Sequence, residues 1–115
     1  MNNNPIGIFD SGVGGLTVCK AIHELLPAEN LIYYGDTARF PYGTRSKETI
    51  IRYSEEISDY LLSRNVKMIV IACNTASAAA LEALREKIDV PVIGVIEAGA
   101  RAACERVKGD IIGVI

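Results

Sequence analysis

Apolar and polar positions alternate along this chain in two different patterns. Short, nearly continuous apolar runs indicate buried strands, and longer stretches with apolar residues three and four positions apart indicate amphipathic helices. Strands are predicted over Ile6–Phe9, Leu31–Tyr34, Val66–Ala72, Val92–Ile96 and Asp110–Ile115. Helices are predicted over Gly15–Leu26, Lys47–Ser63, Ala76–Lys87 and Ala98–Val107, with Ser46 as the N-cap of the second.

The order of these elements predicts the fold class. Strands rich in Val and Ile that alternate with helices are typical of a parallel sheet covered on both faces, so we expect an α/β domain with a doubly wound sheet. Residues 1–115 are long enough to form one domain with a substantial core. The chain ends inside the apolar run Ile111–Ile115, which leads us to expect the front portion of a longer protein.

Composition narrows the range of partners. The chain is 50% hydrophobic and 23% charged with a net charge of −2, which suits an ordinary globular domain and argues against a nucleic-acid partner. The polar start at residues 1–5 is unlike a signal peptide, and no apolar run reaches the roughly 18 residues of a membrane span. We therefore expect a cytoplasmic location and no membrane partner. Three cysteines and one histidine indicate reduced thiols and no metal site.

One cysteine stands where chemistry is expected. The apolar run Met68–Ala72 ends at Cys73-Asn74-Thr75, and the predicted alanine-rich helix follows at once. Cys73 would lie between the carboxyl end of a strand and the amino end of a helix, where open α/β sheets bind ligands. The unpaired N–H groups and the dipole of the helix favour negative charge there, and hence a thiolate. Asn74 and Thr75 can cap the helix or bind a ligand.

The other candidates for thiol or base chemistry have simpler interpretations. Cys19 and Cys104 fall on the apolar stripes of their predicted helices, so both are interpreted as packing residues. His23 lies in the middle of a predicted helix beside Glu24, and we expect a solvated or half-buried side chain rather than a base.

A glycine-rich segment, Asp10-Ser11-Gly12-Val13-Gly14-Gly15, directly follows the first predicted strand. Its three glycines can adopt positive φ and leave N–H groups free to bind an anion. The segment could be a tight turn or a dinucleotide-binding loop, with Asp36 as the acidic residue that contacts the ribose. Thr17 stands where that fingerprint needs another glycine, and the Asp10 carboxylate would repel a pyrophosphate.

The segment after the second strand contains the step Pro41-Tyr42-Gly43. This step suits a rigid turn that presents backbone groups and a phenol, or equally a surface loop with Phe40 or Tyr42 in the core. Loops after the first three strands of a parallel sheet open on one edge, so polar groups from all three can converge. The residues concerned are Asp10, Ser11, Tyr42, Gly43, Cys73, Asn74 and Thr75. They suit a small substrate with carboxylates and chemistry at a carbon acid.

Four segments of the chain resemble the glutamate racemases of the aspartate/glutamate racemase family. They are the opening Ile8–Val18, the second signature Tyr34–Gly43, the first catalytic motif Ala72–Ser77 and the following stretch Val92–Glu97. The resemblance implies that residues 1–115 correspond to the first of two α/β domains. It also implies a homodimer as the common assembly, and no cofactor.

The resemblance further implies an activity, the interconversion of L- and D-glutamate to supply D-glutamate for peptidoglycan. Two cysteines would act on opposite faces of the substrate, which is what racemisation at one carbon requires. Cys73 would take the α-proton of D-glutamate with help from Asp10. The carboxylates and ammonium of the substrate would be held by Asp10, Ser11, Tyr42, Gly43, Asn74 and Thr75.

The second cysteine of the family lies in a Cys-Thr-His motif, which does not occur in these 115 residues. We therefore expect that residues 1–115 alone do not racemise glutamate at a useful rate. Three alternatives stay open at this point: a racemase of another acidic amino acid, a nucleotide-binding α/β module, and a non-catalytic domain used for binding or assembly.

Overall fold

A four-stranded parallel sheet forms the centre of the protein in the computed structural model, which describes residues 3–96, 98, 102 and 105. Its strands, in the spatial order β2-β1-β3-β4, are Leu31–Gly35, Ile6–Asp10, Met68–Ile71 and Val92–Gly94. In the sheet register, Ile8 of β1 lies between Tyr33 of β2 and Val70 of β3. The predicted parallel α/β fold is confirmed. The predicted strand 110–115 and most of the predicted helix 98–107 lie outside the described residues.

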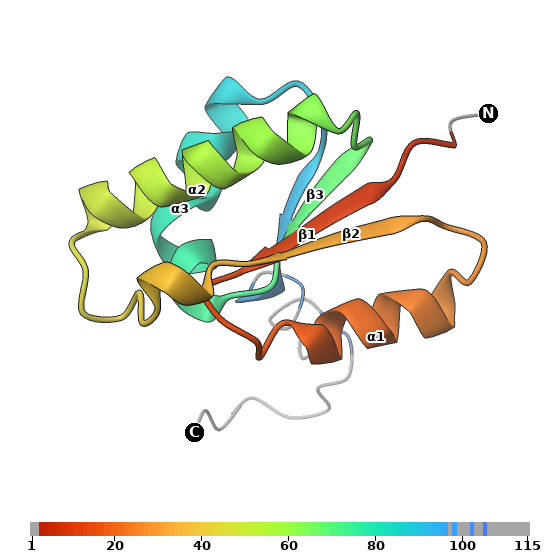
Figure 1. The fold of residues 1–115 in the computed structure, drawn as a ribbon, viewed down its shortest axis with the longest axis horizontal. Coiled ribbons are helices and arrows are strands. Elements are labelled where there is room, and N and C mark those ends of the chain that lie inside the picture. Colours follow the sequence, from red (N-terminus) through yellow and green to blue (C-terminus); the bar gives the residue numbers. More distant parts are fainter. Residues whose placement is uncertain (1–2, 97, 99–101, 103–104, 106–115) are drawn as a thin grey trace.

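Helices cover both faces of the sheet. Helix α1 (Leu16–Leu25) lies on one face, and α2 (Lys47–Ser63) and α3 (Asn74–Lys87) lie on the other (Figure 1). A short 3-10 helix, η1 (Thr37–Arg39), joins β2 to the loop that leads into α2. The chain therefore winds from β1 in both directions, as predicted for a doubly wound sheet.

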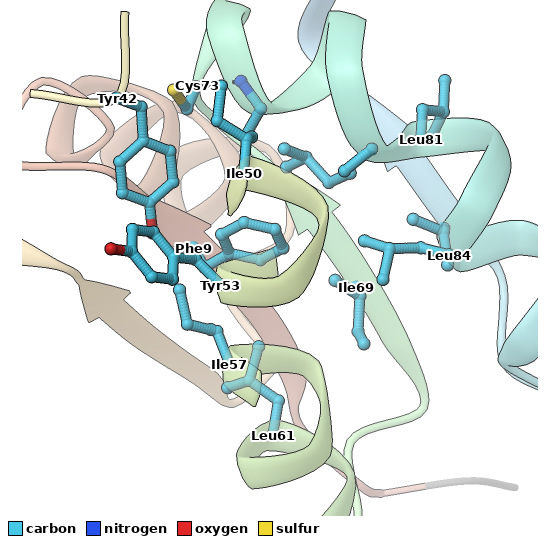
Figure 2. Packing of buried hydrophobic residues seen from close by; sticks show 14 of the residues in the cluster. Phe9, Tyr42, Ile50, Tyr53, Ile57, Leu61, Ile69, Cys73, Leu81 and Leu84 are labelled. Atoms are coloured by element: carbon cyan, nitrogen blue, oxygen red, sulfur yellow. Dashed lines mark hydrogen bonds between the residues drawn. The ribbon is translucent and has the colours of Figure 1, made fainter. Parts of the chain in front are cut away.

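The core has two layers because successive residues of a strand point to opposite faces of the sheet. Phe9, Ile69 and Ile71 face α2 and α3, where Ile57 and Leu61 of α2 are almost completely buried (Figure 2). On the other face, Ile6, Ile8 and Val70 pack with Val18 and Ile22 of α1. Each large apolar side chain removed from water contributes about 1.5–3 kcal/mol, so these two layers hold the sheet between its helices.

The predicted start of α2 is confirmed at the level of its cap. Ser46 has an extended backbone, and its Oγ accepts a hydrogen bond of 3.2 Å from the N–H of Thr49. Within the helix, Ile50, Tyr53, Ile57 and Leu61 are buried, which is the apolar stripe that the sequence predicts.

Three element boundaries differ from the prediction by two residues, and the other differences among the described elements are of one residue. β3 begins at Met68 rather than Val66, because the chain first turns through Asn65 (φ 62°) and the N–H of Val66 donates to the carbonyl of Leu61. β4 ends at Gly94 rather than Ile96, since Gly94 pairs with Ile71, the last residue of β3. α3 begins at Asn74 rather than Ala76, because Cys73 itself is the N-cap.

Candidate active site

The strand order reverses at β1 and β3, and we call the carboxyl edge of the sheet at this topological switch point the opening of the sheet. β1 is central, and the chain leaves it for β2 on one side and later reaches β3 on the other. Helices α1 and α3 diverge to opposite faces from this point (Figure 1). Asp10 is the last residue of β1 and Cys73 follows β3, so both lie where α/β sheets place their ligands.

The carboxylate of Asp10 organises the loop that follows β1. Its side chain is buried, its Oδ1 accepts a hydrogen bond of 2.7 Å from the N–H of Ser11, and its Oδ2 accepts one of 2.5 Å from the N–H of Gly15. Both bonds are charge-assisted, which makes them stronger than bonds between neutral groups. Asp10 thus fixes Ser11 and satisfies a backbone donor at the start of α1.

The expected positive φ of the glycines in this loop is wrong, since no glycine among the described residues has one. Close packing explains Gly15 instead. A Cβ atom on Gly15 would lie 2.8 Å from the Cβ of Asp10 and 3.0 Å from the Cβ of Ala72, so no side chain fits. The N–H of Gly15, one donor that a pyrophosphate would need, already binds Asp10. This arrangement disfavours the dinucleotide-binding interpretation.

Cys73 is confirmed at the junction of strand and helix, where it is also the N-cap of α3. Its sulfur accepts a hydrogen bond of 3.4 Å from the N–H of Ala76. Its thiol donates a hydrogen bond of 3.4 Å to the Oγ of Ser11. The residue is 7% exposed. The loops after β1 and β3, 62 residues apart in sequence, therefore meet at this pair of side chains.

The segment after β2 contains a polar cluster that the sequence analysis missed. Asp36 is 4% exposed, and its Oδ2 accepts hydrogen bonds from the hydroxyl of Tyr42 and, at 2.7 Å, from the Nε of Arg39. The Nη1 of Arg39 also donates to Glu56 of α2 at 2.6 Å, and its guanidinium lies 3.9 Å from the ring centroid of Tyr53. The cluster ties the turn at Tyr42 to α2.

Electrostatics hold this cluster in one protonation state. Burial, and then the hydrogen bond to Asp36, raises the pKa of Tyr42 well above its usual value, so its hydroxyl remains a donor. Burial alone would lower the pKa of Arg39, but hydrogen bonds to Glu56 and Asp36 outweigh it and raise the pKa. The spacing of Asp36 and Arg39, three residues apart at a short helix, is the sequence signal that could have revealed the pair.

The predicted site residues fall into two groups. Asp10, Ser11 and Cys73 are linked by hydrogen bonds. The others lie around them: Tyr42 is buried with its hydroxyl on Asp36, Gly43 and Asn74 are exposed, and Thr75 is half-buried. Of the two interpretations of the Pro-Tyr-Gly turn, the structure has the one with Tyr42 in the core. Tyr42 lies near Cys73, at one end of the apolar layer that faces α2 and α3 (Figure 2). Phe40 is 62% exposed.

The remaining candidates are placed as follows. Cys19 is half-buried and packs in the layer under α1, in keeping with a packing residue, and His23 is exposed. Cys104 lies outside the described residues. Within the described part of the chain, no three His, Cys, Asp or Glu residues are grouped to hold a metal ion. Among those same residues, no helix is long and apolar enough to cross a membrane.

The parallel α/β fold of the described residues is shared with a known class of isomerases, the racemases. The chain belongs to the Asp/Glu/Hydantoin racemase family, whose model matches residues 6–115. Within this family it is similar to the glutamate racemase of Geobacter metallireducens. The two are 60% identical over 110 residues, which cover 96% of this chain and 41% of the relative.

The chain is also similar to solved structures of glutamate racemases. Glutamate racemase from Aquifex pyrophilus has a TM-score of 0.86 and 58% identity, and the match covers 90% of this chain and 41% of that one. Glutamate racemase from Francisella tularensis, solved in complex with D-glutamate, has a TM-score of 0.84 and 48% identity over 89% of this chain and 39% of that one. The chain thus spans about 40% of the length of these relatives.

Proposed function

We propose that this chain acts in a glutamate racemase, where it supplies one of the two cysteines that interconvert L- and D-glutamate without a cofactor. The observation that carries the proposal is the position of Cys73, capping α3 and bonded to Ser11 at the opening of the sheet. A base for a carbon acid must approach one face of the α-carbon within hydrogen-bond reach. A thiol at the amino end of a helix, between two loops, suits that task.

In the proposed step, the Cys73 thiolate takes the α-proton of D-glutamate. The Cα–H bond breaks, an S–H bond forms, and the electron pair of the broken bond moves into the adjacent carboxylate. A second cysteine would then protonate the opposite face of the α-carbon. When Cys73 acts alone, its S–H exchanges with solvent, and the proton that it then returns goes to the same face of the α-carbon. We therefore propose that residues 1–115 by themselves exchange the α-proton without producing L-glutamate.

Substrate binding is proposed for the groups around Cys73. The side chains of Ser11, Asn74 and Thr75 offer hydroxyl and amide groups for the carboxylates of glutamate, and Asp10 offers a carboxylate for its ammonium. Tyr42 would contribute through its main chain, because its hydroxyl already binds Asp36. At Gly43, a Cβ atom would meet nothing within 4 Å, so a ligand has room to approach the backbone.

The biological setting is also part of the proposal. The supply of D-glutamate for peptidoglycan rests on the resemblance to glutamate racemases, and the cytoplasmic location expected from the sequence is kept as part of the proposal. The relative from Francisella tularensis with bound D-glutamate supports the choice of glutamate over another acidic amino acid. The nucleotide-binding alternative is disfavoured, because Asp10 occupies the loop donor and Asp36 binds Arg39 and Tyr42 rather than facing a ribose.

The test is exchange of the α-proton of D-glutamate in deuterium oxide, followed by NMR, with chiral chromatography to detect L-glutamate. We expect loss of the α-proton signal with the unaltered chain and with Cys19→Ser, a control thiol that packs under α1. We expect no loss with Cys73→Ser. Exchange that survives Cys73→Ser would refute the role of Cys73, and a non-catalytic domain would show no exchange with any variant. Formation of L-glutamate would contradict the need for a second cysteine.

A further inference from the structure

Gly12, the residue after Ser11, is held from three directions by β2 and the segment that follows it. The hydroxyl of Tyr33 donates a hydrogen bond of 2.9 Å to the carbonyl of Gly12. A Cβ atom on Gly35 would lie 2.4 Å from that same carbonyl oxygen, so the backbone of Gly35 lies directly against it. The ring of Phe40 packs on the other side, where a Cβ on Gly12 would lie 3.0 Å from Cδ2. We call Tyr33, Gly35 and Phe40 the Gly12 clamp.

The clamp lies one peptide unit from the contact between Ser11 and Cys73. The planar peptide unit between Ser11 and Gly12 includes the Cα atoms of both residues, and the clamped carbonyl is bonded to the Cα of Gly12, so a shift of that Cα displaces Ser11. Ser11 is fixed on its other side by the hydrogen bond from its N–H to Asp10. Burial, followed by the nearby Asp10 carboxylate, raises the pKa of Tyr33, so its hydroxyl remains a donor at neutral pH.

We propose that Tyr33 is a positioning residue, which acts through Gly12 to hold the Oγ of Ser11 against the sulfur of Cys73. The proposal rests on the proposed function, in which Cys73 is the base. When the thiol loses its proton, the Ser11 hydroxyl can turn and donate to the thiolate, and such charge-assisted bonds are stronger than neutral ones. This requires that the two atoms stay at the observed 3.4 Å. A loosened clamp therefore disfavours the thiolate.

The test is the pH profile of alkylation of Cys73 by iodoacetamide in the 115-residue chain. Mass spectrometry of the Cys73 peptide separates this thiol from Cys19 and Cys104. We expect Tyr33→Phe to move the midpoint of the profile to higher pH, with alkylation at neutral pH slowed by about two- to tenfold, the scale of one hydrogen bond. The titratable groups beside Ser11 and Cys73, Asp10 and Tyr42, are not substituted in any variant, and the phenol that Tyr33→Phe removes also lies near the Asp10 carboxylate.

The matched control is Tyr34→Phe, the same substitution one residue along β2. Tyr34 points to the opposite face of the sheet, where its ring lies 5.6 Å from that of Tyr60, and we expect no change in the profile. A second variant, Phe40→Ala, removes an exposed ring of the clamp with little risk to folding. It should move the midpoint in the same direction as Tyr33→Phe.

A double variant separates positioning from a general loss of structure. If Tyr33 acts through Ser11, then Tyr33→Phe should cause no further shift in a Ser11→Ala background. An unchanged profile in Tyr33→Phe, or a full additional shift in the Ser11→Ala background, would overturn the proposal. Alkylation involves no glutamate. Failure of the unaltered chain to exchange the α-proton of D-glutamate would therefore count against the proposed function only, and the alkylation data would still decide the role of Tyr33.

Discussion

Individual side chains at the carboxyl edge of the sheet each make hydrogen bonds to more than one neighbour. Asp10 accepts from two backbone donors, Cys73 both caps α3 and contacts Ser11, and Asp36 accepts from Tyr42 and Arg39. Buried polar groups that are fully paired make the surrounding structure rigid, whereas a missing partner leaves a group that is costly to bury. Substitutions that remove one partner therefore test these networks directly.

Tyr42→Phe should reduce stability at neutral pH and change its dependence on alkaline pH. Loss of the hydroxyl leaves buried Asp36 without one donor, at a cost of about 1–3 kcal/mol. The pKa of Tyr42 is raised in the folded state above the 10.0 of an ordinary tyrosine. Its contribution to stability is therefore complete below about pH 10 and is lost as pH rises further, because the unfolded chain ionises first.

Urea denaturation between about pH 8 and pH 11 measures this effect. The unaltered chain should lose free energy of unfolding above about pH 10, with a slope of up to about 1.4 kcal/mol per pH unit from this residue. Tyr42→Phe should show a shallower decline. Equal slopes for the unaltered chain and Tyr42→Phe would mean that the buried hydroxyl does not resist ionisation.

At the scale of secondary structure, the N-cap residues connect the candidate site to the helices that pack on the sheet. α2 starts at a serine cap and α3 at a cysteine cap, and each cap side chain accepts a hydrogen bond from a backbone N–H in the first turn of its helix. Such a donor has no partner within the helix itself. The position of a cap therefore determines where the helix begins and which residue faces the opening of the sheet.

Ser46→Ala should destabilise the protein by about 1 kcal/mol, the usual effect of losing an N-cap acceptor. Ser46→Asp keeps an acceptor and adds a negative charge at the helix amino end, so it should retain the stability of the unaltered chain. Ser63→Ala, the same change at the exposed last residue of α2, is the control and should cost little, since alanine is favoured within helices. Thermal unfolding of the three variants measures these differences; comparable losses in Ser46→Ala and Ser46→Asp would argue against the capping bond.

The sequence predicted elements and local caps better than contacts between distant segments. The stripe from Ile50 to Leu61, the cap at Ser46 and the junction at Cys73 follow from spacing along the chain, and all are confirmed. The cluster of Asp36, Arg39 and Tyr42 with Glu56 was not predicted, because it depends on how the segment after β2 folds back onto α2. The positive φ expected of the glycines was wrong, because Gly15 is required by close packing instead.

At the scale of the whole molecule, the helices in the described part of the chain cover the two faces of the sheet unequally. Helices α2 and α3 lie on one face and α1 lies on the other (Figure 1). On the side of α1, an apolar pocket lies between α1 and β3–β4. Its lining includes Val18, Ile22, Leu26, Met68, Val70 and Ile93. Leu26 and Ile93 are 49% and 36% exposed. Apolar surface of this kind favours association, in line with the homodimer that the family resemblance implies.

Residues 1–115 should therefore associate with a second copy through this face as concentration rises. Ile93→Lys places a charge in the pocket and should weaken association by tenfold or more, because about 1.5–3 kcal/mol of apolar burial is lost. Leu25→Lys is the control, since Leu25 is 79% exposed and does not line the pocket. Sedimentation velocity over a range of concentrations measures the effect. A monomer at every concentration, or equal effects of the two lysine variants, would contradict this expectation.

The opening between β1 and β3 has a consequence for how such a domain can diversify. It arises from strand order and from the divergence of α1 and α3, whereas the folding energy comes mainly from the two apolar layers behind it. The sheet and its two apolar layers can therefore be retained in evolution while the exposed side chains at the carboxyl edge of the sheet change. Descendants of one ancestral sheet can exchange exposed rim residues such as Asn74 for others and explore new substrates while the same scaffold persists.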